Sequence, residues 1–131
     1  QAISVSSESV LRRSMVATGF AYKAEWMAEN LPLFNELIPQ ARAIRRPGAA
    51  ALDLANLAAG RFDGFWELYL NPWDVAAGML LVAEAGGHVS DESGGPYRFG
   101  HKTIVATNTA LHPELLAALQ AAIARQSTGL E

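Results

Sequence analysis

Apolar residues along the chain recur with two different periods, and segments of the two kinds follow each other. Alternation of apolar and polar positions is typical of strands, whereas recurrence at three and four residues is typical of helices. The first pattern predicts strands over residues 3–6, 14–18, 61–69, 88–91 and 103–107, with a short extended stretch at 43–46. The second predicts helices over residues 24–38, 48–59, from 72 to the Gly86-Gly87 pair, and 113–125. This alternation favours an α/β fold with a mainly parallel sheet flanked by helices.

Proline, glycine and asparagine residues mark where the predicted helices begin, break or end. Pro32 has no amide donor, so the helix over residues 24–38 is expected to kink there or to restart at a cap formed by Asn30. Residues 71–74, Asn-Pro-Trp-Asp, combine a cap residue, a proline at the first helical position and an acid three residues after the cap, which predicts a helix start. Gly60 stands where a left-handed residue usually ends a helix.

The composition is that of one globular domain, residues 1–131. Half of the residues are hydrophobic, which is enough for one core, and no apolar run approaches the roughly 18 to 20 residues that cross a bilayer. We therefore expect no contact with membranes. The start of the chain has no basic segment followed by an apolar one, so we expect no secretion signal. Because the first residue is Gln1 rather than Met, we expect something upstream to have been removed.

Cysteine content and charge exclude several functional classes. The chain has no cysteine, which excludes disulfides and thiolate metal sites and fits a reducing compartment, so the cytoplasm is the expected location. A net charge of -3 gives no long-range attraction to nucleic acid, and nucleic-acid binding is not expected. His88, His101 and His112 lack ligand spacing, so they are expected to be polar residues at the surface or at strand ends rather than a transition-metal site.

Two acids and one turn of small residues remain as candidates for chemistry. Gly48, Ala49 and Ala50 lie at a predicted helix start. Glu67 lies at a predicted strand end and Asp74 in the first turn of the next helix. Ligands of open α/β sheets bind at the carboxyl ends of strands and at helix N-termini. The pattern therefore predicts one site near these five residues.

Each candidate also has a purely structural explanation, and the residues alone leave the choice open. Asp74 suits a helix cap, and it equally suits a hard oxygen ligand for Mg²⁺. Glu67 has the bland explanation of a solvated charge at a strand end. Gly48 serves either as a helix cap or as the place where a polyhydroxylated ligand approaches the backbone. Trp66 and Trp73 are assigned to packing around the Asp74 turn.

Two strings in the second half of the chain carry a specific resemblance to a known family. Residues 73–78, Trp-Asp-Val-Ala-Ala-Gly, and residues 84–91, Glu-Ala-Gly-Gly-His-Val-Ser-Asp, resemble the second signature of the inositol monophosphatase family. Residues 17–20, 44–54 and 59–67 support the resemblance in the order and spacing of that family. The resemblance covers essentially the whole chain, most closely the bacterial members that act on inositol 1-phosphate.

The resemblance implies a Mg²⁺-dependent phosphatase and the C-terminal half of the family's layered α-β-α-β-α fold. It implies that Asp74 ligates a catalytic Mg²⁺ and that Glu67 contacts a substrate hydroxyl. It also implies that the turn of Gly48, Ala49 and Ala50 lines the inositol pocket. In that family two or three Mg²⁺ ions bridge the phosphate, activate a water molecule and stabilise the leaving alkoxide.

Two departures and one absence limit what the resemblance implies. Ala49 stands where the family often has Ser or Thr, and Ala21 where Pro is common, which alters pocket detail without changing the reaction. The family's upstream glutamate and its Asp-Pro-hydrophobic-Asp-Gly-Thr motif, which supply the other metal ligands and the phosphate-binding amides, do not occur in the chain. One carboxylate is too few for tight Mg²⁺ binding. We therefore expect the chain to need the missing N-terminal half and to be inactive alone.

Several functions stay open at this point. The intact protein is expected to hydrolyse inositol 1-phosphate or a related polyol or sugar monophosphate, to be sensitive to lithium and to form a homodimer. Related phosphatases for fructose 1,6-bisphosphate, histidinol phosphate or nucleotide 3′-phosphates share the metal chemistry, although Glu67 and residues 45–48 favour inositol phosphate. A non-catalytic interaction or dimerisation module is the alternative from another class.

Overall fold

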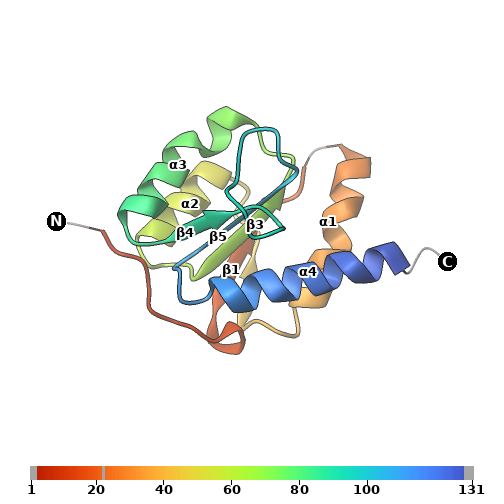
Figure 1. Cartoon of the computed structure of the whole chain (residues 1–131), viewed down its shortest axis with the longest axis horizontal. Helices are drawn as coiled ribbons and strands as arrows, with labels where there is room; N and C mark the ends of the chain where they lie inside the picture. The colour runs from red at the N-terminus through yellow and green to blue at the C-terminus, as the bar shows by residue number, and fades with distance from the viewer. Residues whose placement is uncertain (1–2, 22, 129–131) are drawn as a thin grey trace.

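The computed structural model describes residues 3–21 and 23–128, and strands alternate with helices along them (Figure 1). The elements are the short 3₁₀-helix η1 (Leu11–Arg13), β1 (Met15–Thr18), α1 (Ala24–Leu37), β2 (Ala43–Arg45), α2 (Ala50–Ala58), β3 (Gly64–Leu68), α3 (Pro72–Glu84), β4 (His88–Ser90), β5 (Thr103–Thr107) and α4 (His112–Thr128). The predicted α/β class is confirmed. None of the described helices combines the length and the apolar character that crossing a membrane requires.

The five strands form one mixed sheet in the order β2-β1-β3-β5-β4. Strand β1 pairs parallel with β2 and β3, whereas β5 pairs antiparallel with β3 and β4. The parallel pairing expected from the sequence therefore holds in the β2-β1-β3 half only. The other half differs because residues 91–102, which connect β4 to β5, contain no helix. Such a connection returns the chain antiparallel beside the strand that it left.

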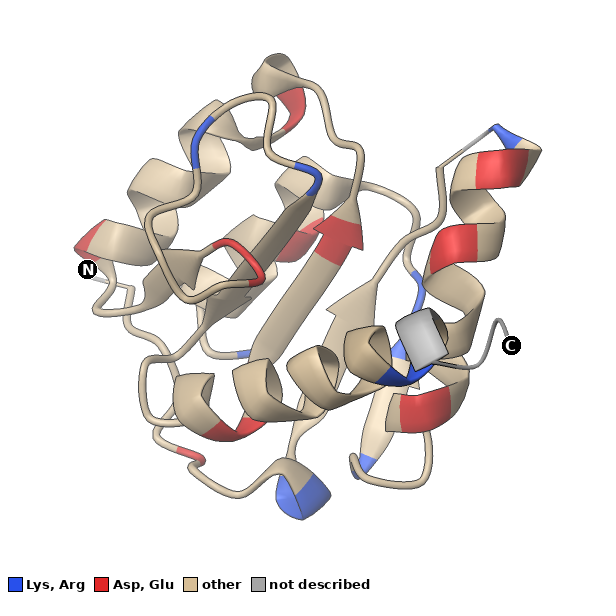
Figure 2. Cartoon of the chain, turned by 45° about the vertical axis from the view of Figure 1, so that its right-hand side comes forward, with Lys and Arg blue, Asp and Glu red and all other residues tan. Residues whose placement is uncertain are grey.

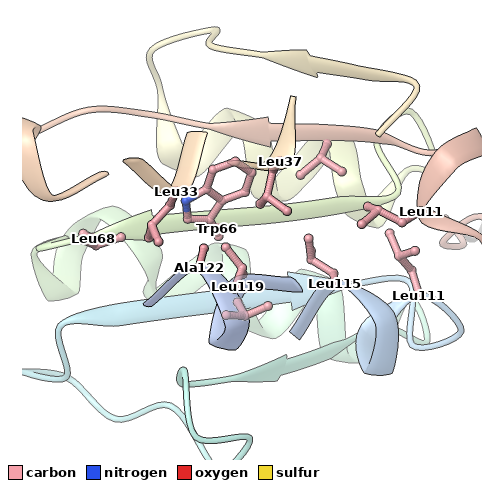
Figure 3. Close-up of a cluster of buried hydrophobic side chains, with 11 residues drawn as sticks. Leu11, Leu33, Leu37, Trp66, Leu68, Leu111, Leu115, Leu119 and Ala122 are labelled. Carbon is pink, nitrogen blue, oxygen red and sulfur yellow. The ribbon is translucent and has the colours of Figure 1, made fainter. Parts of the chain in front are cut away.

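Two helices cover each face of the sheet, so the fold has three layers (Figure 1). Successive residues of a strand point to opposite faces, and the buried strand residues divide accordingly. Val16 and Trp66 belong to the cluster under α1 and α4, which Figure 3 shows in close-up. Ala17 and Phe65 belong to the cluster under α2 and α3. The sheet is thus buried on both sides, as expected where βα units supply the helices.

Helix α1 runs unbroken through Pro32, so the predicted restart at Asn30 is wrong. The Asn30 side chain is buried and holds the helix against the sheet instead of capping a new one. It donates to the Thr18 hydroxyl at 3.2 Å and to the Gly19 carbonyl at 2.8 Å, and it accepts from the Trp66 indole N–H at 2.7 Å. These contacts stabilise the middle of the helix and offset the hydrogen bond that Pro32 cannot donate.

The strand predicted over residues 3–6 is also wrong. The backbone N–H of Val5 donates to the Ala85 carbonyl at 3.1 Å, at the end of α3 rather than on a strand. The Ser6 hydroxyl donates to an Asp63 carboxylate oxygen at 2.5 Å. Residues 3–6 therefore lie against the end of a helix and do not pair with a strand of the sheet, although their alternating pattern is that of a strand.

Candidate active site

A cavity of about 440 Å³ opens at the edge of the sheet where the three parallel strands end. Helix α1 follows β1, α2 follows β2 and α3 follows β3, so three helix N-termini meet at this edge. The cavity is lined from the connections that follow these strands, at residues 19–21, 23–26, 46–50 and 67–74. It is the place where an open α/β sheet binds its ligands.

All five residues predicted from the sequence line this one cavity: Gly48, Ala49, Ala50, Glu67 and Asp74. They come from three segments that the chain order separates and that the parallel pairing of β2, β1 and β3 brings together. In Figure 2 the acidic end of β3 is the red tip of the central arrow, beside the connections that carry the other candidates.

Glu67 lies one residue before the end of β3, and its carboxyl group packs directly over Gly19. A Cβ atom at position 19 would lie 2.6 Å from Glu67 Oε1, so the glycine makes the room that the carboxyl group occupies. Burial raises the pKa of Glu67 to about 7, and the negative charges of Asp53 and Asp74 act in the same direction. A half-buried carboxyl of this kind readily exchanges hydrogen bonds with a ligand hydroxyl.

Asp74 forms the cap that the sequence predicted and still faces the cavity. Its Oδ2 accepts a hydrogen bond from the Asn71 amide at 3.2 Å, and its own amide donates to the Asn71 carbonyl at 2.9 Å. Within residues 3–21 and 23–128, the second carboxylate oxygen of Asp74 receives no hydrogen bond. The capping contact therefore fixes the side chain while one oxygen stays available to a ligand. The structural and the ligand roles of Asp74 are compatible.

The turn before α2 presents backbone groups to the cavity. Gly48 has φ +93°, a conformation that other residues rarely adopt, and a Cβ there would meet nothing within 4 Å. The glycine is thus needed for the turn rather than for room. The helix itself begins at Ala50, later than the sequence predicted, and Ala49 is its N-cap without a side-chain hydrogen bond. The first amides of α2 are consequently free of a side-chain cap at the cavity wall.

Residues 1–124 of the chain match a family model, that of the inositol monophosphatase family. The chain belongs to this family. It is 44% identical over 120 residues to the inositol-1-monophosphatase of Synechocystis sp. and 44% identical over 119 residues to Nus factor SuhB of Pseudomonas aeruginosa. The solved inositol monophosphatase of Anabaena (Nostoc) sp. superposes with a TM-score of 0.87 at 42% identity.

These relatives are longer than the chain. The match to the Synechocystis protein covers 91% of the chain and 42% of that protein, and the match to the Pseudomonas protein covers 88% of the chain and 44% of that protein. The match to the Anabaena structure covers 91% of the chain and 49% of that structure. The chain therefore spans less than half the length of these three relatives. The resemblance to the inositol monophosphatase family and its fold, stated from the sequence, is confirmed.

Asp53 is a residue near the site that the sequence interpretation missed. It is 0% exposed in the first turn of α2, and neither carboxylate oxygen has a hydrogen-bond partner among the described residues. Burial raises the pKa of Asp53 to about 6. Its position in the buried stripe of α2, between Ala50 and Leu57 at helical spacing, was the available signal, since an acid is rare on such a stripe.

An aromatic pair with unusual backbone geometry forms another part of the cavity wall. Tyr69 directly follows β3 with φ +63°, in the left-handed region, and its ring stacks on Trp26 at 4.5 Å between centroids. The Tyr69 hydroxyl donates to Glu29 at 2.6 Å, and Lys102 Nζ donates to the same carboxylate at 2.8 Å. These contacts hold Tyr69 in a conformation that is strained for a residue with a side chain. The sequence shows no sign of them, because they depend on the packing of α1 against β3.

The two tryptophans near the site differ from their predicted roles. Trp66 is fully buried, but it packs under α1 and α4 on the opposite face of the sheet from α3. Trp73 is 77% exposed on the outer side of α3, whereas Val75 and Val82 face the core. Neither residue packs around the Asp74 turn. Helical periodicity places position 73 outward once Val75 points in.

His112 also contradicts its prediction as a surface or strand-end residue. It is buried at the start of α4, with Nε2 2.7 Å from the Ser90 hydroxyl and Nδ1 2.9 Å from the Thr107 hydroxyl. The ring of His88 packs edge-on against it at 4.4 Å. Burial, assisted by His88, lowers the pKa of His112 to about 4. A neutral His112 therefore joins α4 to strands β4 and β5.

Proposed function

We propose that the chain is the C-terminal half of a Mg²⁺-dependent phosphatase that hydrolyses inositol 1-phosphate or a related polyol or sugar monophosphate. The observation that supports this most directly is the single cavity shared by Asp74, Glu67 and the turn of residues 48–50. Membership of the inositol monophosphatase family supports a phosphatase. The site lies at the carboxyl ends of parallel strands, where phosphate esters bind in many α/β folds.

Asp74 is the residue that would hold the metal. Its carboxylate is a hard oxygen donor with one oxygen fixed by the cap and the other available, which suits Mg²⁺. No three His, Cys, Asp or Glu side chains of the described residues form a group that could hold an ion, and the proposal therefore assigns the remaining protein ligands to the upstream half. When bound, Mg²⁺ supplies activation of a water molecule and charge stabilisation of the leaving oxygen.

The polyol side of the substrate would be held by Glu67 and the turn before α2. A Glu67 carboxyl group that burial keeps near the midpoint of its titration can accept a hydrogen bond from a substrate hydroxyl or donate one to it. The uncapped amides at the start of α2 would donate to a second hydroxyl. Hydroxyl recognition of this kind favours inositol 1-phosphate over phosphate esters with apolar bodies.

The missing upstream half is the expected partner of the chain, and the intact protein is proposed to be a cytoplasmic homodimer. The decisive assay measures phosphate release from inositol 1-phosphate by the intact protein, with and without Mg²⁺ and Li⁺. We expect turnover that requires Mg²⁺ and that Li⁺ inhibits. Absence of turnover on inositol 1-phosphate, fructose 1,6-bisphosphate, histidinol phosphate and nucleotide 3′-phosphates alike would refute the proposal. Sedimentation of the same protein tests the homodimer.

A role in a protein assembly is the second candidate function. Relatives 44% to 48% identical to the chain are named Nus factor SuhB rather than phosphatase. The coding sequence upstream of residue 1 separates the two candidates. An Asp-Pro-hydrophobic-Asp-Gly-Thr motif within about one domain length upstream favours the enzyme, and its absence there favours the interaction module.

A further inference from the structure

A second cavity, of about 370 Å³, lies on the face of the sheet that α1 and α4 cover (Figure 1). We call it the α1–α4 cavity. The apolar side chains that line it include Pro32 and Leu33 of α1, Leu68 of β3 and Ile123 of α4. Among the described residues, none lines both this cavity and the one that holds Asp74. Cavities of this size with apolar walls and a few polar groups are typical sites for small molecules.

Three charged side chains line the α1–α4 cavity, namely Glu29, Glu92 and Lys102. Lys102 Nζ donates a hydrogen bond to Glu29 Oε1 at 2.8 Å, and the Tyr69 hydroxyl donates one to Glu29 Oε2 at 2.6 Å. Glu29 is therefore neutralised, and both of its oxygens have a donor. Glu92 belongs to none of the ion pairs found among the described residues. The negative charge of Glu92 is thus left unbalanced at the cavity.

The Glu92 carboxylate is held at the cavity by the backbone that carries it. Gln120 Nε2 of α4 donates to the Glu92 carbonyl at 3.0 Å. On either side of Glu92, Asp91 Oδ1 accepts hydrogen bonds from the amides of Ser93 at 2.9 Å and Gly95 at 3.2 Å. Glu92 Oε1 is buried and receives no hydrogen bond from the described residues. Such an oxygen costs free energy, and a ligand that donates a hydrogen bond to it would remove this cost.

The charge and the walls of the cavity together select the class of ligand. An anion would be repelled by the unbalanced charge of Glu92. A metal ion is also unsuited, because no three His, Cys, Asp or Glu side chains of the described residues form a group that could hold one. An ammonium group on an apolar body matches both features, since the ammonium donates to a carboxylate and the body packs against apolar side chains.

We propose that the α1–α4 cavity binds a small organic cation, a primary amine whose ammonium group donates to Glu92 and whose apolar body lies between α1 and α4. This site is distinct from the cavity at the ends of the parallel strands. It does not depend on the phosphatase assignment, because neither Glu67 nor Asp74 takes part in it.

The test measures binding of three compounds to the intact protein at pH 7 by NMR titration. 2-Phenylethylamine, 2-phenylethanol and 3-phenylpropanoate share one apolar body and carry a positive charge, no charge and a negative charge. We expect the amine to bind at least about tenfold more tightly than the alcohol, the usual effect of one charge-assisted hydrogen bond. The carboxylate should bind more weakly than the alcohol.

Three variants locate the bound amine. Glu92→Gln keeps the shape of the side chain but removes its charge, so the affinity for the amine should fall about tenfold while that for the alcohol is unchanged. Ala28→Trp places a large ring at an exposed position of the cavity and should weaken binding of both compounds. Glu84→Gln is the control, because it removes an exposed acid outside the cavity, and it should bind both compounds as the wild type does. Thermal melting checks that each variant is folded.

Three results would overturn the amine site. The first is the absence of saturable binding of the amine to the wild type at concentrations up to about 10 mM. The second is equal affinity of the wild type for the amine and the alcohol. The third is an unchanged affinity for the amine in Glu92→Gln, which would place the amine at another acid. None of these measurements involves turnover of a phosphate ester, so the proposed function can fail while the amine site stands.

Discussion

At the scale of single residues, the two oxygens of Asp74 have separate tasks. Oδ2 caps α3 through the Asn71 amide, and the other oxygen is available at the cavity. Asp74→Asn keeps an oxygen that can accept the Asn71 hydrogen bond but removes the negative charge that a metal needs. We expect the intact Asp74→Asn protein to lose at least about 100-fold in kcat/KM for inositol 1-phosphate, as when one preorganised electrostatic group is removed from a site. The fold should persist.

Glu84→Gln is the matched control for this prediction, because Glu84 is an exposed acid at the other end of the same helix. Its kcat/KM should equal that of the wild type. Thermal melting of both variants checks that the fold persists, since loss of the cap charge alone should cost only about 1 kcal/mol or less. Normal Mg²⁺-dependent turnover by Asp74→Asn would remove Asp74 from the metal site.

Asp53 makes the stability of the chain depend on pH. Burial raises its pKa from 3.8 to about 6, so between these values the folded state binds a proton that the unfolded state has released. The free energy of unfolding therefore falls as pH rises through this interval and stays lower above it. Asp53→Asn removes this pH dependence. It also removes the negative charge of Asp53, which raises the pKa of Glu67.

Urea unfolding at two pH values measures the effect of Asp53. The quantity compared is the unfolding free energy of Asp53→Asn minus that of the wild type. We expect this difference to be larger at pH 8 than at pH 5 by about 1 kcal/mol, so the variant gains stability relative to the wild type as the pH rises. Glu84→Gln is the control, because Glu84 is an exposed acid at the end of α3 and belongs to none of the ion pairs found among the described residues. A difference of zero for Asp53→Asn would mean that the buried carboxyl has found a partner.

Residue identity predicted residues that line one cavity but not their surroundings. Glu67, Asp74 and the turn at Gly48 were found because their places at element ends follow from local pattern. Asp53 escaped notice because single acids on helices are usually solvated, although its position on the apolar stripe of α2 pointed to burial. The positive φ of Tyr69 likewise depends on Glu29, which is distant in sequence.

At the scale of elements, one glycine sets how closely α2 and α3 approach. A Cβ at Gly78 would lie 2.6 Å from Leu54 Cδ1 and 2.7 Å from Leu54 Cβ, closer than atoms in contact can be. Gly78→Ala improves helix propensity by about 1 kcal/mol, but the two helices must move apart, which costs roughly 1 to 3 kcal/mol. We expect net destabilisation of about 1 kcal/mol in urea unfolding.

Ala77→Gly is the control on the same helix, since position 77 is exposed. It should cost about 1 kcal/mol through propensity alone. The decisive comparison is the sign of the change in unfolding free energy. Relative to glycine, alanine should stabilise the chain at position 77 and destabilise it at position 78. A Gly78→Ala chain that is more stable than the wild type would show that α2 and α3 do not pack as closely as this structure has them.

Local pattern predicted the type of most elements and failed where a tertiary contact decides. The helix start at residues 71–74 was predicted because cap, proline and acid act within one turn. The continuity of α1 across Pro32 was missed because it depends on Asn30 bonding to β1 and β3. The antiparallel half of the sheet was missed because the residues of β5 do not indicate which strands it pairs with or in which direction.

At the scale of the whole molecule, the packing of the core contrasts with the proposed metal site, which has one carboxylate ligand. Buried clusters fill both faces of the sheet, so the described residues form an ordinary three-layer domain. The cavity, by contrast, would offer the proposed metal the single carboxylate of Asp74 and the proposed substrate the Glu67 carboxyl group and the turn of residues 48–50. This division explains how the chain can belong to a phosphatase family while spanning less than half of its relatives.

The isolated chain should therefore fold but fail to hydrolyse phosphate esters. Mg²⁺ gives up its water reluctantly, and one carboxylate replaces too few of its ligands for tight binding. We expect calorimetry to show no saturable binding of Mg²⁺ to the chain alone at concentrations up to about 1 mM, and no release of phosphate from inositol 1-phosphate. Joining the chain to its upstream half should restore both. Turnover by the chain alone, if abolished by Asp74→Asn, would instead show that these residues contain the entire metal site.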